Sequence, residues 1–242
     1  MTITTDGRDL VWDGCFNVRD LGGLGAVRRG AVVRADHVGK LTADGWRALT
    51  AHGVRTVVDL RNPDEYREDA APRPDGVTTV RVPLDGRDVP GADAFWDRWW
   101  GTWEFGTPVY FRPFLTHFPE RVAAVARAVA RAEPGGVVVH CAAGRDRTGI
   151  VALVLLSLAG VAPEEIAADY MLSGERVSAM NAALGRPDDS AELEAGLSGA
   201  GTSAHEAALE VARWFDAPGY LAYAGLSAAD SDALRERLVG ER

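Results

Sequence analysis

The sequence predicts an α/β fold in which helices flank a mostly parallel central sheet. Short runs of β-branched residues alternate along the chain with segments of helical periodicity, the order that parallel βαβ units produce. The three clearest runs begin more than twenty residues apart, which leaves room for a crossover connection between parallel strands. Beyond residue 160 the patterns are helical, so we expect a helical C-terminal third.

Each predicted strand is bounded by Gly, Pro or Asp, which commonly punctuate strands. The predicted buried strands are Val54–Leu60, Val77–Pro83 and Gly136–Cys141, with a weaker candidate at Ala31–Val33. Strand signals that alternate with helix signals are typical of mostly parallel sheets, which are covered on both faces. We therefore expect helices on both sides of the sheet.

Helix signals occupy the segments between these strands. Apolar periodicity or start signals such as an N-cap, a proline in the first turn and early acidic residues mark the predicted helices. These segments are Thr42–His52, a helix starting at Asn62–Glu65, a helix starting at Pro119, the apolar run Ile150–Ala159 and a helix starting at Pro163. We expect a break in the C-terminal helices near Leu184–Ala200 and a flexible loop at Gly196–Ser203.

The composition is that of one globular domain over residues 1–242, with 47% apolar residues and a net charge of −9. An acidic chain lacks the basic surface that nucleic acids require, so we expect no nucleic-acid partner. No apolar run is long enough to span a bilayer, which argues against integral membrane association. The two cysteines, Cys15 and Cys141, suggest neither a disulfide framework nor a metal site, and we expect no cofactor. With no signal peptide in Met1–Gly14, we predict a cytoplasmic protein, leaving export without a signal and the oligomeric state open.

A loop with reactive and charged side chains follows the strand Gly136–Cys141. From His140 to Gly149 the chain reads HCAAGRDRTG, with Cys141 and Arg147 six positions apart. Backbone N–H groups in such a turn, together with the N-terminus of the following helix, bind an oxyanion of phosphate size and favour a thiolate. We therefore predict that Cys141 is a nucleophile and that Arg147 binds phosphate oxygens through its planar fork.

The remaining loop residues are predicted to complete the phosphate site. The phosphate-binding candidates are Ala142, Ala143, Gly144, Arg145 and Thr148. The Thr148 hydroxyl could cap the helix or donate to the sulfur. A structural cysteine is the alternative interpretation, but a glycine and two arginines are poor choices for a merely packed turn.

The loop His140–Gly149 resembles the signature of cysteine-dependent protein tyrosine phosphatases. Three further blocks, Asn17–Gly23, Val32–Asp36 and Thr56–Arg61, extend the resemblance over nearly the whole chain. Together they resemble the bacterial tyrosine/serine and lipid phosphatase family related to mycobacterial protein tyrosine phosphatase B. The resemblance implies a cysteine phosphatase-like fold, a phosphocysteine intermediate formed without metal, and dual specificity that can extend to phosphoinositides.

The resemblance also implies an aspartate general acid inside the loop, which is Asp146 here. Asp85, after the predicted strand Val77–Pro83, is the alternative acid, because the arginines that flank Asp146 disfavour its protonated form. The sequence departs from the family at Arg145, where lysine is usual. Lys40 is the only lysine in the chain, so coding bias and altered specificity both remain possible explanations.

Other ionisable residues follow the predicted parallel strands. Asp59, Arg61, Asp85 and Cys141 all lie at or just past carboxyl ends of strands, where ligands bind in open α/β sheets. We expect these side chains to converge on one crevice. For Asp59 and Arg61, a buried ion pair or a helix cap is an equal alternative to a role in the site.

Three residues are predicted to support the loop rather than to react. His140 precedes the cysteine and is expected to orient it by hydrogen bonding. Arg19 and Asp20 precede a Leu-Gly-Gly turn that the resemblance places near the phosphate loop. We expect this pair to brace the loop.

Four tryptophans lie close together in the sequence, within a predicted lid insertion at about residues 88–118. Trp96, Trp99, Trp100 and Trp103 follow helical i, i+3, i+4 and i+7 spacing, which predicts one apolar helical face. This tryptophan stripe could pack in the core or cover the catalytic cleft as a lid.

The predicted function is the hydrolysis of phosphate monoesters, with a phosphoprotein or a small phosphoester as the partner. Two rivals are a rhodanese-like sulfurtransferase, which also uses a loop cysteine, and an inactive phospho-ligand-binding module. The Cys-x5-Arg spacing and the helix start at Thr148–Gly149 favour phosphate chemistry over sulfur transfer. The presence of a nucleophile, an arginine and a candidate acid argues against an inactive module.

Overall fold

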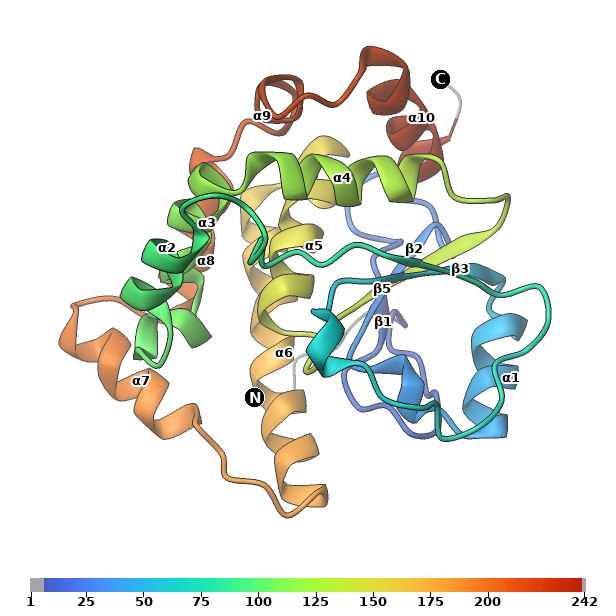
Figure 1. The fold of residues 1–242 in the computed structure, drawn as a ribbon, viewed down its shortest axis with the longest axis horizontal. Coiled ribbons are helices and arrows are strands. Elements are labelled where there is room, and N and C mark those ends of the chain that lie inside the picture. The colour runs from blue at the N-terminus through green and yellow to red at the C-terminus, as the bar shows by residue number, and fades with distance from the viewer. Residues whose placement is uncertain (1–6, 241–242) are drawn as a thin grey trace.

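The computed structural model describes residues 7–240 and contains a five-stranded sheet in the order β1-β2-β5-β3-β4 (Figure 1). The strands are β1 (Arg19–Asp20), β2 (Val32–Ala35), β3 (Val54–Asp59), β4 (Thr78–Arg81) and β5 (Gly136–His140). Strands β2, β5, β3 and β4 are parallel, and β1 is antiparallel to β2. The predicted mostly parallel α/β sheet is therefore confirmed. The two-residue β1 was not predicted, because it is too short to have a periodicity.

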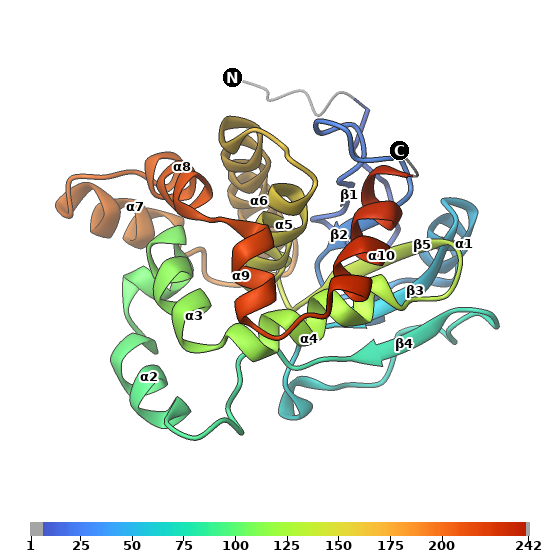
Figure 2. The same ribbon diagram turned by 90° about the horizontal axis from the view of Figure 1, so that it is seen from above.

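Ten α-helices surround the sheet within the described part of the chain. They are α1 (Ala43–Ala51), α2 (Ala92–Trp99), α3 (Phe111–His117), α4 (Pro119–Ala130), α5 (Asp146–Leu158), α6 (Pro163–Ala183), α7 (Ser190–Gly199), α8 (Ala204–Trp214), α9 (Ala217–Tyr223) and α10 (Ala228–Val239). The C-terminal third is helical, as predicted. Figure 2 shows α9 and α10 beside α4, where Arg131 pairs with Asp230 at 2.6 Å.

Alternating side chains of the central strands supply two separate hydrophobic clusters. Val137 and Val139 of β5 belong to the larger cluster, with residues of α4 and α5, whereas Val138 belongs to the smaller one, with Trp46 of α1. Figure 1 accordingly shows α4 and α1 on opposite sides of the sheet. All five residues of β5 are buried, so the strand that precedes Cys141 is held from both faces.

One predicted strand differs in its environment. We expected Val77–Pro83 to be buried, but β4 is an edge strand in which Val80 is 37% exposed. The strand pairs only with β3, so its free edge and part of its surface face solvent. Its β-branched residues predict a strand but do not distinguish an edge strand from a central one.

The predicted helix starts at Thr42 and Pro119 are confirmed, but the start at Asn62–Glu65 produces only a 3₁₀ turn, Pro63–Glu65. The capping interaction is present, since the Asn62 N–H donates to Glu65 Oε2 at 2.9 Å. No helix follows, and prolines at positions 72 and 74 are incompatible with helical extension. The capping pattern therefore predicted a local turn correctly and a helix wrongly.

The helical region after residue 183 is more continuous than expected. We predicted a break over Leu184–Ala200, but α7 forms within it, and the flexible loop expected at Gly196–Ser203 is reduced to residues 200–203. The side chain of Trp103 lies against Gly196, where an added Cβ would meet the indole at 2.4 Å. This tertiary contact stabilises a glycine-containing helix whose intrinsic propensity is low.

The tryptophan stripe does not lie on one helix. Helix α2 ends at Trp99, Trp100 is its C-cap, and Trp103 belongs to a separate 3₁₀ turn. Trp96 stacks on Phe118 with ring centroids 5.9 Å apart, whereas Trp100 is 58% exposed. The glycine at position 101, with φ of +78°, breaks the helical spacing that the sequence predicted.

No helix between residues 7 and 240 combines the length and the apolar character needed to cross a bilayer.

Candidate active site

The predicted phosphate loop runs from the carboxyl end of β5 to the first turn of α5, with Ala142 and Ala143 after the cysteine. The Cys141 side chain is buried, and its Sγ accepts a hydrogen bond from the N–H of Gly144 at 3.3 Å. Gly144 has φ of +71°, and an added Cβ would lie 2.7 Å from the Ala35 carbonyl oxygen. Only glycine allows the turn that directs this N–H toward the sulfur.

Arg147 is held by two acidic residues from other parts of the chain. Its Nη1 and Nη2 donate to the two oxygens of Glu65 at 2.5 and 2.8 Å, and Nη1 also contacts Asp85 Oδ2 at 3.4 Å. Paired donors of this kind fix the plane of a guanidinium group. Arg147 follows Cys141 by six positions in the same loop.

Glu65 is the member of the site that the sequence analysis missed. The sequence pattern indicates only a helix start at this acidic side chain, although it lies four residues after the end of the family-like block Thr56–Arg61. Burial favours the neutral acid, but the Arg147 guanidinium holds the pKa of the Glu65 carboxyl below its ordinary value. Glu65 therefore carries a negative charge that orients Arg147 at neutral pH.

We expect Glu65→Gln to lower kcat/KM for an aryl phosphate by about tenfold, because the charged two-point contact with Arg147 is lost. Glu68→Gln is the matched control, since Glu68 is an exposed acid three residues away. Steady-state kinetics at neutral pH measure both variants. Equal kcat/KM values for the two variants would contradict the orienting role of Glu65.

Asp146, the predicted general acid, begins α5 within the loop. Its carboxylate oxygens both lie 3.3 Å from Nε of Arg145, and its side chain is 22% exposed. The guanidinium of Arg145 also pairs with both oxygens of Asp189, each at 3.2 Å. Arg145 thus connects the phosphate loop to the start of α7, a contact that no local pattern indicates.

Asp85, the alternative acid, is buried beside Arg147. Burial raises the pKa of its carboxyl above the ordinary value, and the positive charge of Arg147 opposes this shift without cancelling it. Asp85 Oδ2 accepts a hydrogen bond from Asn62 Nδ2 at 2.6 Å, and its backbone oxygen accepts one from Trp96 Nε1 at 3.0 Å. Both predicted acids therefore lie at or near the loop, Asp146 partly exposed beside Arg145 and Asp85 buried beside Arg147.

Asp59 and Arg61 form a buried ion pair next to the loop. Arg61 donates to Asp59 through Nε at 2.9 Å and through Nη2 at 2.7 Å, and His140 Nε2 lies 3.6 Å from Asp59. Burial lowers the pKa of His140 to about 4, although Asp59 opposes this shift. His140 is therefore neutral at pH 7, and its Nδ1 lies 3.1 Å from the Cys141 carbonyl oxygen.

Asp20, Arg19 and Thr148 are each predicted to support or complete the loop, and their observed contacts differ. Asp20 does not reach the loop; it accepts hydrogen bonds from the N–H groups of Gly22 and Gly30, both at 2.7 Å. Arg19 instead donates to Asn17 Oδ1 at 2.6 Å. The buried Thr148 hydroxyl has no hydrogen-bond partner among residues 7–240, so neither of its predicted contacts is present in this structure.

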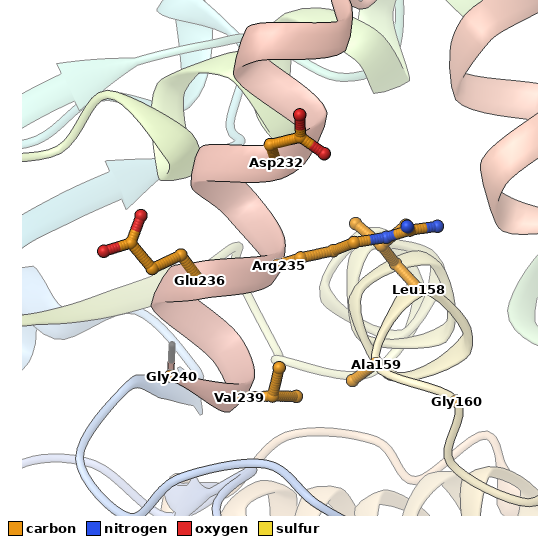
Figure 3. A pocket seen from close by; sticks show the side chains of 8 residues that line it. All are labelled: Leu158, Ala159, Gly160, Asp232, Arg235, Glu236, Val239 and Gly240. Atoms are coloured by element: carbon orange, nitrogen blue, oxygen red, sulfur yellow. The ribbon is translucent and has the colours of Figure 1, made fainter. Parts of the chain in front are cut away.

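Two cavities differ in their relation to the loop. One, of about 710 Å³, lies between α10 and the carboxyl-terminal end of α5, whereas the phosphate loop adjoins the opposite end of that helix (Figure 3). Another, of about 540 Å³, lies beside Arg145 and is bounded by α6, α7 and the start of α8. Arg145 belongs to its lining, together with Tyr170, Met171 and Leu193, so the second of these two cavities adjoins the phosphate loop.

Comparison with known proteins adds to this geometry. The family model described as the tyrosine phosphatase family matches residues 10–240. A candidate tyrosine-protein phosphatase of Cupriavidus necator is 32% identical over 184 residues, covering 72% of this chain and 66% of the relative. A tyrosine-protein phosphatase of Nostoc commune is 32% identical over 169 residues, 69% of this chain and 54% of the relative. The triple specificity protein phosphatase PtpB of Mycobacterium tuberculosis is 28% identical over 198 residues, 71% of each chain.

The alignments cover less than two thirds of the length of the Cupriavidus and Nostoc relatives. The family model, by contrast, matches nearly all of this chain. The resemblance predicted from the loop and the three N-terminal blocks is therefore confirmed at the level of the family. The loop geometry and the extent of the match agree: this chain belongs to the tyrosine phosphatase family.

Proposed function

We propose that the protein hydrolyses phosphate monoesters through a phosphocysteine intermediate. The observation that carries the proposal is the hydrogen bond of the Gly144 N–H to Cys141 Sγ, in a loop that also supplies Arg147. The amides and the start of α5 create a positive field that favours a thiolate and binds an oxyanion. We propose phosphotyrosine as the main substrate, with phosphoserine, phosphothreonine and phosphoinositides within range.

In the proposed reaction the Cys141 thiolate attacks phosphorus, and the bond between phosphorus and the ester oxygen breaks. The leaving oxygen takes a proton from a carboxylic acid, which becomes a carboxylate. Water then attacks the phosphocysteine, the S–P bond breaks to restore the thiolate, and the water proton passes to that carboxylate. Arg147 and the loop amides stabilise the charge on the equatorial oxygens in both steps.

We propose Asp146 as the acid that protonates the leaving group. Asp146 is partly exposed at the loop, where a leaving oxygen can reach it, whereas Asp85 Oδ2 is occupied by Asn62 and Arg147. The raised pKa of Asp85, caused by burial, supports the alternative in which Asp85 carries the proton. Leaving-group dependence distinguishes the two assignments.

The cavity of about 540 Å³ beside Arg145 supports a substrate that carries a group larger than phosphate. We propose that this cavity receives part of a phosphoprotein side chain or of a smaller phosphoester. Both cysteines are free thiols, which suits a reducing compartment, so we propose a cytoplasmic location.

The direct test compares initial rates on phosphotyrosine, phosphoserine and phosphothreonine peptides and on phosphoinositides, with an aryl phosphate as the reference. We expect turnover of the aryl phosphate with a chelator present and the highest kcat/KM on phosphotyrosine. Formation of a Cys141 persulfide from thiosulfate, without phosphatase activity, would favour sulfur transfer instead. Phosphate binding without turnover of any substrate would favour an inactive binding module.

Residues 88–118 are proposed to contribute a lid to this single domain. The indole of Trp96 is tied to the Asp85 backbone, and the exposed Trp100 lies under the guanidinium of Arg87 at 5.4 Å from the ring centre. The segment therefore combines a partly buried anchor with an exposed aromatic surface near a candidate acid.

We expect Trp100→Ala to raise KM for bulky aryl phosphates about threefold or more, while KM for small phosphoesters changes little. Trp214→Ala is the control, because Trp214 is also partly exposed but lies on α8. Kinetics and thermal unfolding are measured together, since an exposed side chain contributes little to stability. A loss of stability without a change in KM would assign Trp100 to core packing.

A further inference from the structure

The outer side of the phosphate loop is held by three hydrogen bonds from the N-terminal part of the chain. The backbone N–H of His37 donates to the Ala142 carbonyl at 3.2 Å. Asn17 Nδ2 donates to the Ala143 carbonyl at 3.0 Å, and Arg34 Nη2 donates to the Gly144 carbonyl at 2.8 Å. Three consecutive carbonyl groups of the loop are thus anchored on one side.

Anchored carbonyls determine where the amides point. In a trans peptide the C=O and the N–H of one plane point in opposite directions, so a carbonyl fixed outward turns the next N–H inward. The bond from the Ala143 carbonyl to Asn17 accordingly accompanies the bond from the Gly144 N–H to Cys141 Sγ at 3.3 Å. By the same rule, Arg34 directs the N–H of Arg145 toward the inner side of the loop.

One carboxylate, Asp169 on α6, holds both side-chain donors. Asp169 Oδ2 accepts from Arg34 Nη1 at 2.6 Å, and Oδ1 accepts from Arg19 Nε at 2.9 Å. Arg19 in turn donates from Nη1 to Asn17 Oδ1 at 2.6 Å, which leaves the Asn17 amide nitrogen facing Ala143. Asp169 therefore sets the position of Arg34 directly and that of Asn17 through Arg19.

The group around Asp169 has an excess of positive charge. Arg8, Arg19 and Arg34 all pair with this carboxylate, and all four side chains are less than 10% exposed. Burial opposes ionisation of Asp169, but Arg19 and Arg34 hold its pKa far below the ordinary value. A buried ion cluster needs good geometry to offset desolvation, and three cations around one anion leave net positive charge behind the loop.

We propose that Asn17 and Arg34, held in place by Asp169, are positioning residues that turn the amides of residues 143–145 toward the Cys141 sulfur and the bound oxyanion. This inference rests on the phosphate-binding role proposed above for the loop. It gives the N-terminal block Asn17–Gly23 and the block Val32–Asp36 a defined task in catalysis. Under this proposal the residues around Asp169 orient the loop amides and do not only stabilise the fold.

The test compares Arg34→Met with Arg8→Met. Each variant removes one guanidinium from Asp169, but only Arg34 also contacts the loop, whereas Arg8 contacts the Asp20 carbonyl. Calorimetry with inorganic phosphate is expected to show at least a tenfold loss of affinity for Arg34→Met and less than a threefold change for Arg8→Met. Asn17→Leu removes the donor to Ala143 without touching Asp169, and its affinity for inorganic phosphate is expected to fall about tenfold. This variant decides the outcome if Arg34→Met fails to fold.

A second measurement responds to amide orientation but not to stability. The rate of Cys141 alkylation by iodoacetamide is followed against pH by peptide mass spectrometry, which distinguishes Cys141 from Cys15. The midpoint is expected to move up by about one pH unit in Asn17→Leu, because the thiolate loses the Gly144 amide donor, and to stay in place in Arg8→Met.

Unchanged phosphate affinity and an unchanged alkylation midpoint in the folded Asn17→Leu variant would overturn the positioning role while leaving the proposed function intact. If the unaltered protein binds no phosphate and turns over no phosphoester, the proposed function falls, and the inference falls with it.

Discussion

Replacing Cys141 with serine is expected to abolish phosphatase turnover, by at least about 10⁴-fold in kcat, while inorganic phosphate still binds. A serine hydroxyl stays protonated in the field that favours a thiolate, so the nucleophile is lost. The amides of the loop and Arg147 remain, so the oxyanion site is preserved. Stopped and continuous assays with an aryl phosphate measure the turnover, and calorimetry measures the binding of phosphate.

Cys15→Ser is the matched control for this variant. The Cys15 thiol donates to the His37 carbonyl at 3.5 Å, and burial together with Asp36 raises its pKa well above the ordinary value, which makes it a poor nucleophile. We expect Cys15→Ser to keep normal turnover and Arg147→Ala to lose both turnover and phosphate binding. Substantial activity in Cys141→Ser would refute a phosphocysteine intermediate.

Asp146→Asn is expected to slow the hydrolysis of alkyl phosphates and phosphoserine by about 10²- to 10⁴-fold, because their basic leaving groups need a proton in the transition state. An activated nitrophenyl ester should slow by much less, since its phenolate departs unaided. A plot of log kcat/KM against the pKa of the leaving group therefore becomes steeper in the variant. A series of aryl and alkyl phosphates provides the measurement.

Asp85→Asn is the paired variant. Asp85 contacts Arg147, so its loss is expected to lower kcat/KM by a similar factor for every leaving group. The opposite result, with a steep dependence in Asp85→Asn and a uniform effect in Asp146→Asn, would transfer the acid role to Asp85. The raised pKa of Asp85, caused by its burial, makes that outcome chemically reasonable.

The elements that the sequence predicted well are those whose signals are local. The N-cap Thr42 accepts from the Gly45 N–H, and Pro119 begins α4, because capping and first-turn chemistry depend on residues three or four positions apart. The run Val77–Pro83 was also correctly predicted to be a strand, but its predicted burial was wrong. Burial depends on the strand's position in the sheet, which its own residues do not encode.

The tryptophan stripe and α7 also depend on contacts between residues that are far apart in the chain. Regular spacing predicted one helix from Trp96 to Trp103, but the chain turns at position 101, and the indole of Trp103 packs instead on Gly196 of α7. That contact joins residues more than ninety positions apart. It also places a helix where composition favoured a flexible loop.

The sequence alone determined the reactive loop, because Cys141, Gly144 and Arg147 are close in the chain and one turn between a strand and a helix brings them together. Tertiary structure alone decided what surrounds it. Glu65 reaches Arg147 from 82 positions away, and Arg34 reaches the Gly144 carbonyl from 110. Such partners meet only when β2 and β3 pair on either side of β5, since the order of strands, not spacing along the chain, sets which charged groups share a buried site.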